Sequence, residues 1–208
     1  MQRAYDKLLC WVKDCMYSLT KLTNDIYYFE NIIEDYELIL DSISVWKTVI
    51  NRDKSFSWDT KTLQDRDAPQ SLKDAHYLAK EIWMIDHGLN SSEYPPVPSI
   101  VIWKRGVGFG MSPHTDSAWT EESFDKVAKT HDVFLTVLSY FSKDFEGGEI
   151  TFPEHNISIK PSPGSILVFR GNKMHGLNPV SKGIRTVGSQ FYLDQETYKE
   201  LVKTWETS

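Results

Sequence analysis

Apolar residues recur three and four positions apart in three stretches of the chain, the spacing of one face of an α-helix. Residues 3–21 and 34–46 show this pattern, so each is expected to form an amphipathic helix. The third stretch covers residues 71–88, where Ser71 is suited to cap the start of a helix and Gly88 to end it. These stretches predict that the first part of the chain is mainly helical.

Two further segments of this first part depart from the helical pattern. Residues 26–33 are aromatic and apolar, and they predict a short strand. Residues 51–70 are polar and irregular, so we expect them to form a loop. Residues 1–95 are therefore interpreted as a mainly helical region that supports the segment after it.

The pattern changes after the proline-rich segment that ends at Pro98. Short runs rich in β-branched and aromatic residues follow one another, separated by glycine, proline and asparagine, which is typical of strands joined by turns. These runs are residues 99–103, 133–141, 149–152, 157–159, 165–169 and 185–192. Residues 144–153 are expected to bend before an edge strand. The number and spacing of the runs favour a double-sheet jelly roll or a small barrel over residues 96–193.

The end of the chain returns to the helical pattern. In residues 194–208, Asp194 can cap a helix whose apolar residues are again three and four positions apart. Helices of this kind most often pack on one face of a sheet, so we expect an α+β fold in a single domain over residues 1–208. The expected core is a double-stranded β-helix, a jelly roll of the cupin-like kind, with the N-terminal helices packed on one sheet and a C-terminal helix.

Composition and charge narrow the range of functions. The chain of 208 residues is 40% hydrophobic and 25% charged, as in ordinary globular domains. Its net charge of −6 argues against a broad phosphate-binding surface, and hence against a nucleic-acid partner. Cys10 and Cys15 point away from each other on a helix, so no disulfide is expected. Because no signal peptide and no apolar run of about 20 residues occurs, we expect a cytoplasmic protein without a membrane span.

Three residues of the β-rich part form a candidate metal site. His114 and Asp116 are two positions apart, and such residues point to the same face of a strand. A pair of this spacing is common by chance, so a third ligand has to be found. His175 is the best candidate, because it follows a predicted strand and turn whereas the other histidines lie in the helical part or in turns. Two imidazoles and one carboxylate on one side of a metal form the ligand set of non-haem Fe(II) oxygenases.

An arginine at a fixed distance beyond the second histidine adds to this pattern. Arg185 follows His175 by ten residues. A guanidinium at the mouth of a barrel needs an anionic partner, and its planar set of donors matches a carboxylate. Arg185 is therefore a candidate for holding the far carboxylate of a dicarboxylic cosubstrate, and the alternative is an ordinary surface arginine.

Four segments carry a resemblance to a known family. They are "PHTDS", "VLSYFSKDFEGGEITFP", "ISIKPSPGSILVF" and "MHGLNPVSKGIRTVGSQFY", and they span roughly residues 97–193. In order and spacing they resemble the Fe(II)/2-oxoglutarate-dependent dioxygenases, in particular the prolyl 4-hydroxylase-like branch. The resemblance implies that His114, Asp116 and His175 bind iron and form the catalytic centre. It also implies that Arg185 pairs with the distal carboxylate of 2-oxoglutarate.

Three more residues are expected at the site, the first two from the resemblance and the third from the long polar connection that follows Asp116. Tyr140 matches a tyrosine that hydrogen-bonds the same carboxylate in relatives, and the alternative is a strand tyrosine that fills the core. Trp103 is the nearest match to a tyrosine that lines the cosubstrate pocket, although an indole can only donate a hydrogen bond. Trp119 is placed at the inner edge of a lid over the iron, and the alternative for residues 121–129 is a surface helix.

The function that this resemblance implies is hydroxylation of an unactivated C–H bond, most simply on a prolyl residue of a peptide or protein. Fe(II), 2-oxoglutarate and O2 are the implied cofactor and cosubstrates, succinate and CO2 the co-products, and ascorbate the expected reductant. The alternatives are the same chemistry on a free amino acid, small molecule or nucleobase, a non-catalytic jelly-roll binding module, or a non-redox cupin with zinc or manganese.

Overall fold

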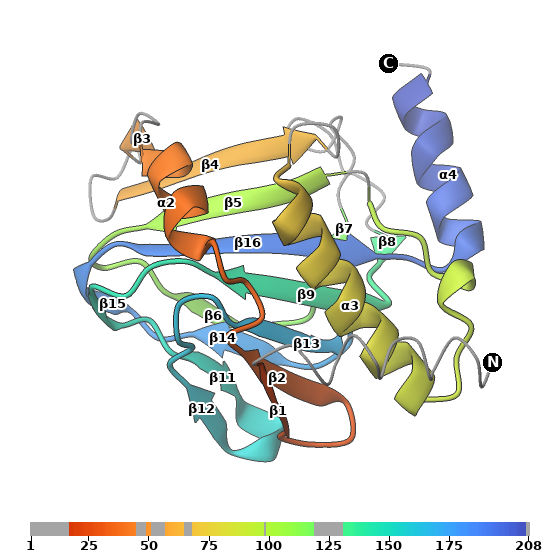
Figure 1. Cartoon of the computed structure of the whole chain (residues 1–208), viewed down its shortest axis with the longest axis horizontal. Coiled ribbons are helices and arrows are strands. Elements are labelled where there is room, and N and C mark those ends of the chain that lie inside the picture. Colours follow the sequence, from red (N-terminus) through yellow and green to blue (C-terminus); the bar gives the residue numbers. More distant parts are fainter. Residues whose placement is uncertain are drawn as a thin grey trace.

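The computed structural model describes residues 17–44, 49–50, 57–64, 68–97, 99–118 and 131–206. In these residues, two antiparallel sheets pack against each other and helices cover the outer face of the larger one (Figure 1). The larger sheet contains β1 (Ser18–Lys21), β2 (Ile26–Glu30), β3 (Val49–Ile50), β4 (Ser57–Gln64), β5 (Ser99–Arg105), β9 (Leu135–Tyr140), β13 (Ile166–Arg170) and β16 (Arg185–Tyr192). Their spatial order is β1-β2-β13-β9-β16-β5-β4-β3.

The smaller sheet has the order β12-β11-β14-β6. Its strands are β6 (Met111–His114), β11 (Ile150–Phe152), β12 (Ile157–Ile159) and β14 (His175–Leu177). Two further strand pairs join β10 (Phe145–Gly147) to β15 (Val180–Gly183) and β7 (Ser117–Ala118) to β8 (His131–Asp132). The helices are α2 (Tyr36–Ser44), α3 (Gln70–Asp86) and α4 (Gln195–Glu206). Within the described residues, no helix combines the length and the apolar character needed to cross a bilayer.

Both faces of the central strands of the larger sheet are buried, one under helix α3 and the other under the smaller sheet. On the outer face, Trp83 and Met84 of α3 pack against strand residues such as Ile102. On the inner face, Phe152 of the smaller sheet packs against residues such as Phe169. Strands that are apolar on both faces read as continuous hydrophobic runs, which is why the sequence predicts them well.

The two faces of strand β16 contact different parts of the protein. Alternate side chains of a strand point to opposite faces. Arg185, Val187, Ser189 and Phe191 line a pocket between the two sheets. Gln190 lies on the other face, where its side-chain oxygen is 3.1 Å from Nδ1 of His76 on α3. The strand therefore joins the helical layer to the pocket.

Most of the predicted elements are confirmed. The helix expected at residues 71–88 is α3, and the chain leaves it through Gly88, whose φ of 66° suits glycine. The C-terminal helix is α4, and the Asp194 carboxylate accepts hydrogen bonds from the backbone N–H groups of Glu196 and Thr197. Ser71 does not cap α3, because it lies inside the helix and donates to Asp35. Helix α2 and strand β2 also lie where they are expected.

Three predictions for secondary structure are wrong. Residues 18–21 form β1 rather than the end of a helix, while residues 1–16, including both cysteines, lie outside the described residues. Residues 57–64, expected in a loop, form β4. These residues are mostly polar and show no apolar pattern, and the strand is formed by its pairing with β5. Strand β11, expected at an edge, lies between β12 and β14, so β12 is the edge.

Candidate metal centre

The pairing of β6 with β14 brings the two candidate histidines together. His175 lies directly opposite His114 in the register of these strands. Asp116 follows the end of β6, and its backbone N–H donates to the carbonyl of Gly171 at 3.0 Å. A Cβ atom at Gly171 would lie 2.1 Å from the carbonyl oxygen of Val133, so only glycine permits this close approach. Asp116 is thus held by the turn after β13 rather than by a strand of its own.

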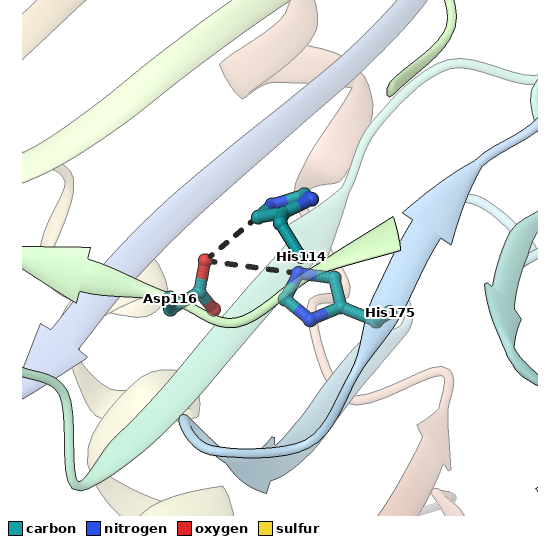
Figure 2. Close-up of side chains that lie close together, drawn as sticks. All are labelled: His114, Asp116 and His175. Carbon is teal, nitrogen blue, oxygen red and sulfur yellow. Dashed lines mark ion pairs between the residues drawn. The ribbon is translucent and has the colours of Figure 1, made fainter. Parts of the chain in front are cut away.

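The three side chains converge on one point, as Figure 2 shows. Oδ1 of Asp116 is 3.9 Å from Nε2 of His114 and 3.7 Å from Nε2 of His175. One nitrogen or oxygen atom from each of the three residues lies within 4.8 Å of the other two. Each atom is therefore at a separation that a single metal ion could bridge, because typical metal–nitrogen and metal–oxygen bonds are about 2.0–2.2 Å.

Hydrogen bonds behind the three residues direct their lone pairs inward. Nδ1 of His114 lies 2.9 Å from the carbonyl of Ser112, and Nδ1 of His175 lies 2.9 Å from the carbonyl of Lys173. A carbonyl only accepts, so Nδ1 carries the proton in both rings and Nε2 is left as a metal donor. Because each tautomer is fixed in this way, the residues fit a divalent ion that accepts two nitrogens and one oxygen.

The carboxylate is oriented in the same manner. Thr136 of β9 donates its hydroxyl proton to Oδ2 of Asp116 at 2.6 Å, which leaves Oδ1 directed at the two histidines. The sequence contains no sign of this contact, since Thr136 is twenty residues from Asp116 and reads as an ordinary strand residue.

The surroundings of the two histidines differ. His175 is buried beside the ring of Phe169, with ring centroids 4.7 Å apart. Burial lowers the pKa of His175, and the negative charge of Asp116 opposes that shift only in part. The ring is thereby kept neutral and able to bind a metal. The His114 side chain is 34% exposed, so the cluster opens to solvent on the side of β6.

A pocket of about 400 Å³ connects this cluster to the inner face of the larger sheet. Arg185 lines it and is 3% exposed, and its Nε atom has no hydrogen-bond partner among the described residues. The guanidinium carbon lies 5.2 Å from the ring centre of Tyr140. The Arg185 side chain is therefore buried in the pocket wall and is not the surface arginine that the sequence left open.

Tyr140 is also buried, and its hydroxyl has no hydrogen-bond partner among the described residues. Burial raises the pKa of Tyr140 to about 12, so the hydroxyl keeps its proton and remains a donor. A phenol hydroxyl without a partner beside the unpartnered Nε of a buried guanidinium is suited to binding an anion. The hydroxyl of a tyrosine that only filled the core would be expected to have a partner.

Of the two tryptophans expected at the site, one can be described. Trp103 of β5 lines the pocket with its ring, and its Nε1–H donates to Oγ of Ser189 at 3.0 Å. Its single donor is therefore already engaged by the protein. Trp119 and residues 121–129 lie outside the described residues.

One charged residue of the pocket is not among the residues predicted from the sequence. Arg105, two positions after Trp103 on β5, is 8% exposed and lines the same pocket. The alternation of β5 could have identified it, because residues two apart on a strand share a face.

Comparison with known proteins agrees with this arrangement. Residues 99–193 match the model of the 2OG-Fe(II) oxygenase superfamily. The sequence is 32% identical over 93 residues, 44% of the chain, to a PKHD-type hydroxylase of Synechococcus sp. (strain CC9902). It is 26% identical over 145 residues, 62% of the chain, to a PKHD-type hydroxylase of Pseudomonas putida (strain W619). The chain spans 39% and 61% of the lengths of these relatives.

The likeness in fold covers more of the chain. The crystal structure of the viral collagen prolyl hydroxylase from Paramecium Bursaria Chlorella virus-1, in complex with 2OG, matches with a TM-score of 0.57 at 16% identity. The match covers 86% of this chain and 97% of that one. It confirms the predicted α+β fold with a double-stranded β-helix core. The match over residues 99–193 relates this β-rich part of the chain to the 2OG-Fe(II) oxygenase superfamily, and the likeness to the viral enzyme shows a shared fold.

Proposed function

We propose that this protein is an Fe(II)- and 2-oxoglutarate-dependent hydroxylase acting on a prolyl residue of a peptide or protein. The observation that carries the proposal is the convergence of His114, Asp116 and His175 at one end of a pocket that also holds the buried guanidinium of Arg185, whose Nε has no partner among the described residues. A metal ion at the three-residue cluster would bind the 2-oxo acid end of 2-oxoglutarate. The guanidinium would bind its distal carboxylate. The likeness in sequence to PKHD-type hydroxylases and in fold to a collagen prolyl hydroxylase supports a prolyl substrate.

The protein residues divide into groups with different tasks. The two neutral imidazoles of His114 and His175 and the carboxylate of Asp116 would hold a metal ion from one side and leave room for small ligands. The chemistry that Fe(II) supplies there, with 2-oxoglutarate and O2, is insertion of one oxygen atom into a C–H bond, with succinate and CO2 as co-products. Arg185 and Tyr140 donate hydrogen bonds to the far carboxylate and so orient the cosubstrate. Leu138 and Val187 line the pocket and exclude water from it.

The substrate is proposed to approach from the side of His114, where the cluster is exposed. Met111 at the start of β6 is 37% exposed and also lines the pocket, so it offers apolar surface to the carbon skeleton of a substrate. Ascorbate is proposed as the reductant that keeps the iron in the ferrous state.

The proposal is tested by single-turnover measurement of succinate. Purified protein is mixed anaerobically with Fe(II) and 2-oxoglutarate, then exposed to O2 with and without proline-containing peptides. We expect succinate release that rises with a suitable peptide, whose mass increases by one oxygen atom. His175→Ala should abolish both signals, whereas His155→Ala, the same change at an exposed histidine outside the cluster, should leave them unchanged. Absence of succinate from the wild-type protein under all these conditions would refute the proposal.

A further inference from the structure

Two arginines face each other in the wall of the pocket. Arg105 ends β5 and Arg185 begins β16, and the two residues are direct partners in the antiparallel register. Side chains of direct partners lie on the same face of a sheet, with Cβ atoms about 4.5–5.5 Å apart. Both guanidinium groups therefore enter the pocket from neighbouring positions, and both residues are buried, with exposures of 8% and 3%.

In the described part of the chain, these two charges have no compensating carboxylate. Among the described residues, no acidic side chain lies within ion-pair distance of Arg105 or Arg185. The neighbours of Arg105 are aromatic instead, with its guanidinium carbon 3.9 Å from the ring centre of Phe109 and 4.6 Å from that of Trp103. These rings fix the position of the guanidinium and attract its charge, but they do not neutralise it.

The charged form of Arg105 is consequently disfavoured in this pocket. Burial, and secondarily the positive charge of Arg185, lower the pKa of Arg105 to about 9. Like charges placed directly opposite each other in a sheet destabilise it, and a buried cation without a partner does so further. An anion bound between the two guanidinium groups would remove both penalties.

We propose that Arg105 and Arg185 together bind one carboxylate, the distal carboxylate of the dicarboxylic cosubstrate, as a two-guanidinium clamp. The inference rests on the proposed function and deepens it. A carboxylate has about four lone-pair sites and can accept two bidentate partners, so one anion is enough for both residues. The clamp selects 2-oxo acids that carry a second carboxylate and discriminates against those with an apolar end.

The same chemistry could be provided by an acidic group of the primary substrate, and the position of the pair argues for the cosubstrate. Arg105 lies opposite Arg185, whose guanidinium is beside the unpaired hydroxyl of Tyr140. A carboxylate at this place would reach both guanidinium groups, and the other end of the same molecule would lie toward the metal cluster that lines the same pocket.

The clamp is tested by calorimetry on Zn(II)-loaded protein, which binds 2-oxo acids but does not turn over. The probes are 2-oxoglutarate and 2-oxovalerate, which has the same five-carbon chain without the second carboxylate. We expect Arg105→Met to raise the Kd of 2-oxoglutarate at least about tenfold and to leave the Kd of 2-oxovalerate within about twofold. Arg105→Lys, which keeps the charge but lacks the planar fork, should fall between the two.

Two controls separate the clamp from a structural role. Lys104→Met removes one positive charge from the opposite face of β5 and should change neither Kd. The melting temperature of metal-free Arg105→Met should be no lower than that of the wild type, because a buried charge without a partner has been removed. If this variant fails to fold, the same comparison is made with Arg105→Lys.

The outcomes are distinct. Equal weakening of both 2-oxo acids, or no effect on either, would overturn the clamp, and so would an Arg105→Met variant that binds 2-oxoglutarate normally but loses affinity for an acidic peptide. In each of these cases Arg185→Met still weakens 2-oxoglutarate binding if the proposed function is right. A wild-type protein that binds neither 2-oxo acid would refute the proposed function together with the clamp.

Discussion

The hydrogen bond between Thr136 and Asp116 allows a test of how strongly a residue outside the metal cluster sets metal affinity. Thr136 is fully buried on β9 and donates to Oδ2 of Asp116 at 2.6 Å. Thr136→Val replaces the hydroxyl with a methyl group of similar size and leaves the carboxylate without its fixed donor. The carboxylate can then rotate, so that Oδ1 is no longer held toward His114 and His175.

The magnitude follows from the kind of bond. A hydrogen bond to a charged group contributes about 1.5–3 kcal/mol. If that free energy serves to fix the carboxylate in its metal-binding orientation, its loss corresponds to a weakening of metal affinity by about 10- to 100-fold. We therefore expect the Kd for Mn(II) or Zn(II), measured by competition with a chelating dye, to rise by this factor.

A matched control distinguishes orientation from general loosening of the sheet. Thr186 is a buried threonine on the neighbouring strand β16 and makes no contact with the cluster. Thr186→Val should leave the metal Kd unchanged. An unchanged Kd in Thr136→Val as well would refute the reasoning, because it would mean that the three ligands are held without the hydroxyl.

Two further predictions concern stability. His76 is fully buried, and burial lowers its pKa from 6.5 to about 4 despite its contact with Gln190. In the unfolded chain the same imidazole binds a proton more readily, so protonation favours unfolding. The free energy of unfolding should fall by about 3 kcal/mol as the pH is lowered from above 6.5 toward 4. His76→Gln should remove this pH dependence in urea titrations, and an unchanged pH dependence would contradict the assignment. Gly171→Ala should lower stability by about 1–3 kcal/mol and weaken metal binding, because the new methyl group meets the backbone of Val133. Gly88→Ala, with no atom within 4 Å, should lower stability by about 1–2 kcal/mol through its backbone conformation alone and leave the metal Kd intact.

The sequence predicts those parts of the fold whose pattern is local. Strands β9 and β13 are largely apolar runs, β16 contains β-branched and aromatic residues, and α3 has helical periodicity together with a terminal glycine. Strand β4 could not be predicted, because its residues are polar and its partner β5 lies far away in sequence. Strand β1 also lacks an apolar pattern, because its side chains are exposed and it lies at one edge of the sheet, where it pairs with β2.

The candidate site divides in a similar way. His114 and Asp116 are recognisable from their spacing, and His175 from the turn that precedes it. Arg105 could have been placed in the pocket from the alternation of β5, but its pairing with Arg185 depends on the register of the sheet. Thr136 carries no such signal, because its contact with Asp116 joins residues that are twenty positions apart.

The alternation of β16 means that eight consecutive residues are subject to two unrelated kinds of selection. The positions on the side of α3 are constrained by packing and by the contact between Gln190 and His76. The positions between them are constrained by the chemistry of the pocket. A shift of this strand by one residue would exchange the two sets, turning Arg185 toward the helices and Gln190 into the pocket. Correct pairing of β16 during folding is therefore a condition for activity as well as for stability.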